Sequence, residues 1–420
     1  MCEETIKYLF LQLKKILLTG KKMNHLSNRI NAIEESATIA MSQKARELKA
    51  QGQDVISLSL GEPDFKTPKH IQQAAKDAID EGKYFSYPPV PGYPDLRKAI
   101  AEKLENENNI PCKPENIVVS AGAKHSIANV FFCLLNPGDE VIIYSPYWVS
   151  YKDIVVLAEG KPVLISGNIE NNFKATADQL KAAITDKTKA VIFSSPCNPT
   201  GAVFSREEIS AMAEVLSSHK NIYVIADEIY EYINFSGEHV SIGSMPGMEN
   251  NTITVNGFSK GAAMTGWRVG YIAAPLWLAK ACSKLQGQFT SGIAGISQRA
   301  ALAAITGDQQ PRLDMAATYQ TRRDMVLNLL NEIPGVKTYL PNGAFYIFPD
   351  ISSYFGKSNG TVTINNSNDL SMYLLEDALV STVSGDAFGA PESIRISYAA
   401  SDENLKEALS RIKNSLAKLK

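Results

Sequence analysis

The stretch Asn256-Gly-Phe-Ser-Lys-Gly-Ala-Ala-Met-Thr-Gly-Trp-Arg268 places a lysine, Lys260, among small residues, shortly after an apolar, β-rich run. Small neighbours leave room for a planar group beside the lysine amine. A lysine sheltered from water loses its proton more easily and can attack an aldehyde to form a Schiff base. Arg268 ends the stretch with a planar, permanently charged guanidinium that suits a phosphate. A flat ring that carries an aldehyde and a phosphate is pyridoxal phosphate (PLP), and we expect it as the cofactor.

Length and composition indicate an ordinary globular protein. A chain of 420 residues is long enough for a large domain and a smaller one. Hydrophobic residues make up 45% and charged residues 20% of the chain, as in soluble proteins generally. The formal net charge of −2 points neither to nucleic acid nor to an acidic membrane, so we expect neither as a partner.

The cysteines and histidines suggest neither disulfides nor a metal. Five cysteines, Cys2, Cys112, Cys133, Cys197 and Cys282, are scattered and lack a Cys-x-x-Cys pair. This favours reduced thiols and a cytoplasmic location. The five histidines show no paired ligand spacing, and we therefore expect no metal site.

The first 22 residues differ from the rest of the chain. Their apolar part is interrupted by Lys14 and Lys15, and it is too short and too charged to span a bilayer. It is followed by no small-residue cleavage site, and Met23 begins a more ordinary N-terminus. We expect residues 1–22 to be a dispensable extension, with a membrane-surface helix as the alternative.

Apolar, β-rich runs alternate with helical patterns through the middle of the chain. Such runs suit strands buried on both faces of a sheet, and helical stretches at 125–135 and 206–218 fit right-handed crossovers between them. The pattern predicts a large α/β domain over residues 66–309, with a mostly parallel sheet of about seven strands. The runs span residues 117–120, 140–145, 162–166, 190–195, 223–226, 252–255 and 267–273.

The pattern changes near residue 310. Two helical segments flank short β-like pieces, which predicts a smaller α/β domain over residues 310–420. The N-terminal segment 23–65 contains a helical pattern and precedes the first strand of the large domain, so we expect it to pack with the small domain. The helical segments are 38–50, 319–332 and 402–418, and the β-like pieces are 345–348 and 393–397.

Polar residues follow several predicted strands, at the carboxyl ends where open α/β sheets bind ligands. Asp227 is placed to face a pyridine nitrogen and keep it protonated, which makes the ring an electron sink. Tyr230 and Asn198 are candidates to hydrogen-bond the ring oxygen. The structural alternatives are ordinary: an Asp here often caps a helix, and Asn198-Pro-Thr-Gly201 has the composition of a turn.

Three further features suit a ring with a phosphate and an amino-acid substrate. The amides of Gly122, Ala123 and Lys124 open a predicted helix, where partial positive charge attracts phosphate. Trp148 can stack on the ring, and Arg395 can grip an α-carboxylate. Taken singly, each has a stronger structural alternative: close packing, a core position or a surface ion pair. Their joint occurrence at strand ends favours a site.

The order of these motifs resembles that of class I PLP-dependent aminotransferases, over roughly residues 27–418. The resemblance implies the fold type I of PLP enzymes, covalent attachment of PLP to Lys260, catalytic roles for Lys260, Asp227 and Tyr230, and ping-pong exchange between amino acids and 2-oxo acids. The motifs are Gly61-Glu-Pro-Asp-Phe65, Tyr87-Pro-Pro-Val-Pro-Gly92, Asn198-Pro-Thr-Gly201, Asp227-Glu-Ile-Tyr230, Gly257-Phe-Ser-Lys-Gly-Ala-Ala-Met-Thr-Gly-Trp-Arg-Val-Gly270 and Arg395-Ile-Ser-Tyr398.

The same resemblance implies two further roles and a homodimer. Gly61 is similar to the glycine whose backbone meets the substrate carboxylate. Tyr87 is similar to a tyrosine that reaches the phosphate in the neighbouring subunit, because the family's active sites lie at a dimer interface. One position departs from the family: Gly257 replaces a phosphate-binding serine that many members carry. We expect that contact to be missing or supplied by other residues.

Two segments, Ser36-Ala-Thr-Ile-Ala-Met41 and Ser145-Pro-Tyr-Trp-Val-Ser-Tyr151, resemble the beta branch of aspartate aminotransferases. In that branch a threonine matching Thr38 and a lysine matching Lys124 receive the acidic side chain. This implies aspartate as donor and 2-oxoglutarate as acceptor, and it leaves prephenate, alanine and aromatic amino acids open.

Two other classes of protein remain to be weighed. A ligand-sensing regulator on this fold carries a helix-turn-helix domain, for which residues 1–26 are too short. A PLP-dependent lyase uses the same cofactor residues, and the motifs leave it open. Formation of a 2-oxo acid that requires an amino acceptor separates the lyase from the aminotransferase.

Overall fold

The computed structural model describes residues 25–420, which fall into two units, one that ends at Glu34 and one that spans Glu35–Lys420. In the described part of the first unit, helix α2 (Asn28–Asn31) is capped by Ser27, whose hydroxyl oxygen accepts a hydrogen bond from the Ile30 amide. The predicted extension, residues 1–22, lies outside the described residues, so its dispensability stays a prediction. The elements below all belong to the second unit.

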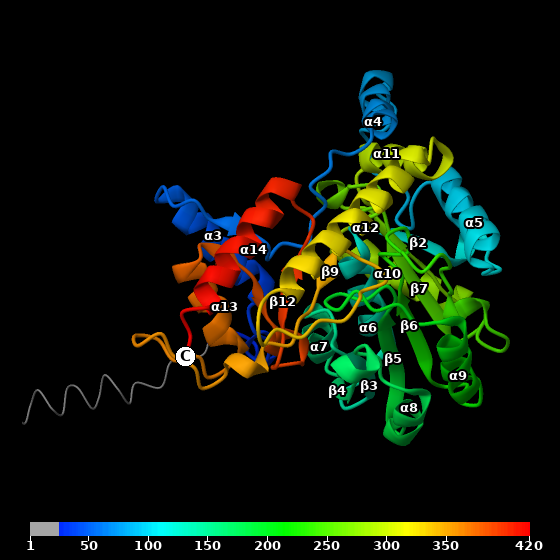
Figure 1. Ribbon diagram of the computed structural model, residues 1–420. Coiled ribbons are helices and arrows are strands. Elements are labelled where there is room, and N and C mark those ends of the chain that lie inside the picture. Colours follow the sequence, from blue (N-terminus) through cyan, green and yellow to red (C-terminus); the bar gives the residue numbers. More distant parts are fainter. Residues whose placement is uncertain (1–24) are drawn as a thin grey trace, which may run out of the picture. The chain divides into compact units, whose positions relative to one another are not determined.

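The largest sheet of the second unit has seven strands, in the order β2-β8-β7-β6-β5-β3-β4 (Figure 1). Strands β7, β6, β5, β3 and β4 run parallel, whereas β8 is antiparallel to both of its neighbours. This confirms the predicted mostly parallel sheet. The strands are β2 (Ile117–Ser120), β3 (Glu140–Ser145), β4 (Lys161–Ser166), β5 (Thr188–Ser194), β6 (Tyr223–Asp227), β7 (Thr252–Gly257) and β8 (Gly270–Ala273).

Side chains along each inner strand alternate between two apolar layers. Val141 and Ile143 of β3 belong to one cluster of buried residues, and Ile142 between them belongs to another. Helices cover both layers, which explains the near-continuous apolar runs of the sequence. The first layer includes residues of α6 (Ala123–Leu134), α7 (Ser150–Leu157) and α10 (Leu276–Phe289). The second layer is covered by α8 (Ala177–Ala183) and α9 (Arg206–Ser217). A third cluster of buried residues includes residues of α4 (Lys69–Glu81), α5 (Pro94–Asn108) and α11 (Gly295–Thr306).

Two strands differ from the predicted pattern. β4 was expected to be buried on both faces, but it lies at the edge of the sheet, and only Ile165 of its six residues is buried. Trp267 was expected to begin the last strand. It instead ends a short 3-10 turn, Thr265–Trp267, and Arg268 follows with φ at 56°, a left-handed conformation that interrupts any strand.

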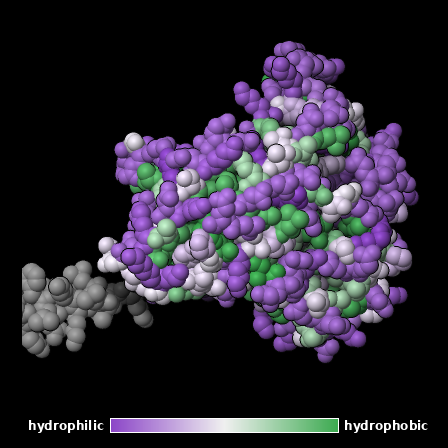
Figure 2. All heavy atoms as spheres, viewed as in Figure 1, coloured by the Kyte–Doolittle hydropathy of each residue, from purple (hydrophilic) through white to green (hydrophobic). Residues whose placement is uncertain are grey.

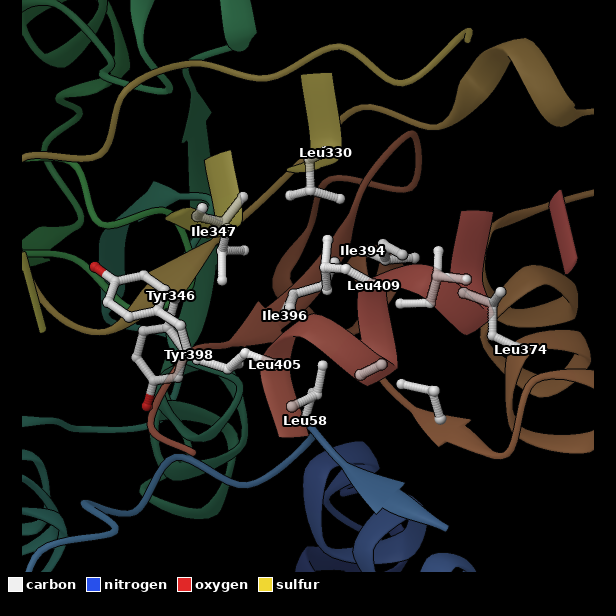
Figure 3. Close-up of a cluster of buried hydrophobic side chains, with 14 of the residues drawn as sticks. Leu58, Leu330, Tyr346, Ile347, Leu374, Ile394, Ile396, Tyr398, Leu405 and Leu409 are labelled. Atoms are coloured by element: carbon white, nitrogen blue, oxygen red, sulfur yellow. The ribbon is translucent and has the colours of Figure 1, made fainter. Parts of the chain in front are cut away.

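The C-terminal elements and the N-terminal part of the second unit share apolar cores. β1 (Ile56–Ser57) pairs in parallel with β10 (Val380–Ser381), and α3 (Ala37–Ala50) packs beside Leu375. Figure 3 shows Leu405 and Leu409 beside Ile396 in the larger of these cores. The remaining elements are α12 (Gln310–Asn331), β9 (Tyr346–Ile347), α13 (Ser367–Asp377), β11 (Val383–Ser384), β12 (Ile394–Ser397) and α14 (Asp402–Leu416). The predicted boundaries at residues 65 and 309 stay predictions, because Glu35–Lys420 form one compact unit.

Hydrophilic residues cover most of the face seen in Figure 2, with hydrophobic residues in small groups. Among the helices that the structure describes, none has the length and apolar character required to cross a membrane. Three large apolar side chains are nevertheless strongly exposed: Phe85 at 67%, Tyr87 at 95% and Phe289 at 65%.

Candidate active site

Three predicted site residues follow adjacent strands at one edge of the sheet. Asp227 is the last residue of β6, Asn198 follows β5, and Lys260 follows β7. Because β5, β6 and β7 are parallel neighbours, their carboxyl ends meet at the same edge. The geometry matches the usual ligand position of open α/β sheets.

Lys260 is partly buried, and its amine faces backbone and aromatic groups. The Nζ atom donates a hydrogen bond to the Gly61 carbonyl oxygen at 2.5 Å and lies 5.8 Å from the ring centres of Tyr230 and Phe345. Burial lowers the pKa of Lys260 to about 8, although the negative charge of Glu62 acts to raise it. A much larger fraction of the amine is therefore neutral near pH 7 than for an exposed lysine, as a nucleophile requires.

Asp227 is buried, with each carboxylate oxygen held by a donor. The Tyr151 hydroxyl donates to Oδ2 at 2.6 Å, and the Ile229 amide donates to Oδ1 at 3.3 Å. Burial raises the pKa of Asp227 to about 6, and the hydrogen bond from Tyr151 opposes that rise. Tyr151 was not predicted as a site residue. The sequence feature that could have indicated Tyr151 is its position in the segment Ser145-Pro-Tyr-Trp-Val-Ser-Tyr151, which also contains Trp148.

Arg395 is 1% exposed and has no acidic partner among the described residues. Its Nη1 donates to Asn198 Oδ1 at 2.9 Å, and its Nη2 donates to the Ser59 carbonyl at 2.6 Å. Its Nε is buried without a hydrogen-bond partner. A buried guanidinium held by neutral groups needs an anion, so the alternative of a surface ion pair is wrong. The residue fits a carboxylate ligand.

Tyr230 contacts a second residue that the sequence reasoning did not assign. Its hydroxyl lies 2.7 Å from that of Tyr346, and the two rings meet nearly edge to face, at 76°. Tyr346 also leaves no space for a side chain at Gly61, where an added Cβ would lie 2.1 Å from the Tyr346 hydroxyl. Gly61 thereby brings its backbone close to both Lys260 and Tyr346.

Gly122 and Arg268 form a cradle at the start of α6. Gly122 caps this helix with φ at 87°, and a Cβ there would lie 2.5 Å from Arg268 Nη2. Arg268 is exposed and donates to the carbonyls of Thr265 and Ala121 at 3.0 and 3.1 Å. The Ala121 amide donates to His125 Nδ1 at 3.2 Å, and burial lowers the pKa of His125, which favours the neutral acceptor. A helix N-terminus beside a guanidinium fits a phosphate.

The departure at Gly257 has a steric reason. An added Cβ would lie 2.8 Å from both the Gly270 Cα and the Val269 carbonyl oxygen. β7 and β8 pair here, with Gly257 opposite Gly270. The backbone therefore leaves no space for the serine that many family members carry at this position.

Lys124 and Trp148 meet beside the cradle. The Lys124 ammonium lies 4.9 Å from the Trp148 ring centre, and desolvation and the charge of Arg268 lower the pKa of Lys124. Thr38 is half-buried in the first turn of α3, and its Oγ1 has no hydrogen-bond partner within residues 25–420. Ala37, next to it, packs on the same apolar cluster as Trp148. The start of α3 and Trp148 therefore contact the same apolar cluster.

Tyr87 is strongly exposed within this single chain. Its side chain is 95% exposed, in the loop before α5.

A cluster of metal-ligand types lies next to Asp227 in sequence. Glu228, Glu231 and His239 present ligand atoms within 4.8 Å of one another. These atoms are already engaged: Lys103 and Asn108 hydrogen-bond Glu231, and His239 Nε2 lies 3.0 Å from Glu228. The carboxylates raise the pKa of His239 despite burial. The cluster is therefore a hydrogen-bonded network.

Comparisons with known proteins identify the family of the chain. The family model "Aminotransferase class I and II" matches residues 53–412. An aspartate/prephenate aminotransferase of Cereibacter sphaeroides is 46% identical over 393 residues, which cover 93% of this chain and 98% of the relative. A bifunctional aspartate aminotransferase and glutamate/aspartate-prephenate aminotransferase of Petunia hybrida is 46% identical over 400 residues, covering 94% and 83%.

Solved structures give the same result. The aspartate aminotransferase from Rhizobium meliloti has a TM-score of 0.91 and 43% identity, covering 94% of this chain and 100% of that chain. The aspartate aminotransferase from Thermus thermophilus with maleate has a TM-score of 0.87 and 40% identity over the same shares. The chain therefore belongs to the class I and II aminotransferases and has the fold of these PLP-dependent enzymes.

Proposed function

We propose that this chain binds PLP at Lys260 and transfers the amino group of aspartate to 2-oxoglutarate. The observation that carries the proposal is the partly buried Lys260 amine, whose pKa burial lowers to about 8, near the buried charges of Asp227 and Arg395. When bound, PLP supplies an electron sink for the charge that develops at the substrate Cα.

The cradle and the strand ends would hold the cofactor. Arg268 and the amides of residues 122–124 would bind the phosphate. Tyr230 and Asn198 would donate to the ring oxygen, Trp148 would cover the ring, and Asp227 would face the ring nitrogen. The support is chemical: the polar contacts pair a donor with an acceptor or opposite charges, and Trp148 offers an aromatic face to the ring.

The chain's own groups divide the remaining work. With PLP bound, the neutral Lys260 amine would be the base that takes the proton from the substrate Cα and the acid that later gives it back. Arg395 binds the α-carboxylate with donors that are not committed to Asn198 or Ser59, since a guanidinium has five N–H groups. The Gly61 backbone lines the same subsite.

The preference for an acidic donor rests on Lys124 and Thr38. Lys124 supplies a positive charge beside Trp148. Thr38 supplies a hydroxyl without a described partner, and its neighbour Ala37 packs on the apolar cluster that Trp148 also contacts. The Thermus relative was solved with maleate, which like aspartate carries two carboxylates. Prephenate also carries two carboxylates and is the second candidate, favoured by the name of the Cereibacter relative.

A panel of amino donors with 2-oxoglutarate tests the proposal. The PLP-loaded protein should give the highest kcat/KM with aspartate, and prephenate should be assayed with glutamate as donor. Lys260→Ala should abolish turnover, whereas Lys98→Ala, at an exposed lysine paired with Glu102, should not. Release of 2-oxo acid without an acceptor would instead indicate a lyase.

We also infer a homodimer in which Tyr87 serves the partner's site. The support is the 95% exposure of Tyr87, together with the exposed Phe85 and Phe289. Light scattering of the purified full chain should give twice the mass of the chain. A strictly monomeric protein with full activity would contradict the inference.

A further inference from the structure

We propose that Tyr151 is a positioning residue: its hydroxyl fixes the Asp227 carboxylate in the ionised form and orientation that a protonated cofactor ring requires. The inference rests on the proposed function, because Asp227 is the group proposed to face the ring nitrogen.

Tyr151 and Asp227 are joined by a short, buried hydrogen bond. Tyr151 lies in the first turn of α7, and Asp227 ends β6. Tyr151 is 1% exposed and Asp227 is 4% exposed, and the hydroxyl donates to Oδ2 at 2.6 Å. The Ile229 amide donates to the other oxygen, Oδ1, so the two donors together fix the plane of the Asp227 carboxylate.

Tyr151 is itself held in place. Its ring meets Trp148 edge to face, with centroids 5.5 Å apart and planes at 88°, and it packs in the apolar cluster beneath the sheet. Trp148 is the residue proposed to cover the ring. One tyrosine therefore links the residue over the ring to the carboxylate at its nitrogen.

The hydrogen bond opposes the effect of burial on Asp227. Burial raises the pKa of Asp227 to about 6, and donation from Tyr151 holds it below the value that burial alone would give. The neighbouring charge of Glu228 raises this pKa, and that of Lys260 lowers it.

Tyr151 also remains a donor throughout the working range. Burial and the Asp227 charge raise its pKa well above the usual value. The Cys197 thiol interacts electrostatically with both Tyr151 and Asp227. Burial raises the pKa of this thiol to about 11, so it stays neutral. Among Tyr151, Cys197 and Asp227, only Asp227 therefore titrates near neutral pH.

The test compares Tyr151→Phe with Tyr144→Phe. Tyr144 is also a buried tyrosine, but its hydroxyl has no hydrogen-bond partner within the described residues. For the parent and both variants, the Kd of PLP for the PLP-free protein is measured as a function of pH. Asp227 must be ionised for tight binding, so affinity should fall as pH drops through the pKa of Asp227. Without the hydroxyl this pKa rises, and the acidic limb should move about one unit upward in Tyr151→Phe only.

The same variants give a second readout at two fixed pH values. At about pH 5, below the pKa of Asp227, PLP should bind roughly tenfold more weakly to Tyr151→Phe than to the parent, since one unit of pKa corresponds to that factor. Near pH 7, where the Asp227 carboxylate of the parent is mostly ionised, the loss should be only about twofold. In an Asp227→Asn background, Tyr151→Phe should change the Kd no further, because the two residues act as a pair.

A variant that keeps the side-chain volume protects the test against misfolding. Fluorotyrosine at position 151 is a more acidic phenol and a stronger donor, so the acidic limb should move downward. An unchanged limb in both Tyr151 variants, or an equal shift in Tyr144→Phe, would overturn the inference. A parent protein that binds no PLP at Lys260 would overturn the proposed function instead.

Discussion

The guanidinium carbon of Arg395 lies 4.6 Å from the ring centre of Tyr346. The hydroxyl of the same tyrosine lies 2.7 Å from that of Tyr230. Tyr346 therefore joins the residue proposed to bind the substrate carboxylate to the residue proposed to bind the ring oxygen. A change at any of the three should disturb both subsites.

The pKa of Lys260 can be measured without the cofactor. In the PLP-free protein, burial lowers this pKa from 10.5 to about 8. Only the neutral amine reacts with an acylating reagent, so the labelling rate of Lys260 should rise with pH and level off above about pH 8. Peptide mass spectrometry follows it, with exposed lysines as internal controls. A midpoint near that of the exposed lysines would contradict the assigned burial.

Lys260 should also carry the cofactor. Borohydride treatment of the PLP-loaded protein should fix the cofactor to Lys260, detected in the peptide map. Lys260→Ala should still bind PLP, without a covalent bond, and lose nearly all turnover. Transamination at the parent rate by this variant would remove Lys260 from the mechanism.

Asp227→Ala should slow turnover by several powers of ten, because a ring nitrogen without its anion is a poor electron sink. Asp227→Glu should retain more activity, since it keeps the charge at a slightly different place. Single-turnover kinetics at saturating aspartate separate this loss from weaker binding. A nearly unchanged rate for Asp227→Ala would mean that the carboxylate is structural.

Gly61→Ala should lower kcat/KM for every donor, because its Cβ would lie 2.1 Å from the Tyr346 hydroxyl. Removing that hydroxyl should relieve the clash, since the next ring atom lies 3.2 Å away. The double variant Gly61→Ala/Tyr346→Phe should therefore be more active than Gly61→Ala alone. Steady-state kinetics of the parent, both single variants and the double variant decide the point.

Lys124→Ala should lower kcat/KM for aspartate far more than for alanine or phenylalanine. A desolvated charge pair contributes a few kcal/mol, which corresponds to about a hundredfold or more in kcat/KM. Equal losses for acidic and neutral donors would assign Lys124 to the cofactor cradle. A parent enzyme that prefers alanine or an aromatic donor would remove the aspartate assignment and leave the family unchanged.

Deleting residues 1–22 should leave activity and soluble yield almost unchanged, because their composition differs from the family-like sequence after Met23. Sedimentation with vesicles of anionic lipid tests the alternative of a membrane-surface helix. Aggregation of the shortened chain, or vesicle binding by the full chain alone, would contradict the expectation.

The sequence alone determined the layered fold and the strand ends. Continuous apolar runs predicted strands buried on both faces, and the position of Asp227 at the end of β6 and of Lys260 after β7 made both residues candidates for the site. Local patterns carry this information because a buried strand must be apolar along its length and ligands bind beyond its carboxyl end. The edge strand β4 departs from this rule, since only Ile165 of its six residues is buried.

Only the tertiary structure decided which side chains meet. Tyr151 contacts Asp227 although 76 positions separate them, and Tyr230 contacts Tyr346 across 116 positions. The local sequence around a tyrosine does not indicate which distant residue it will contact. The contact and the pKa of the contacted group depend on burial and on how distant segments pack together. The lack of space at Gly257 likewise arises from the approach of β8, and no local pattern could foretell it.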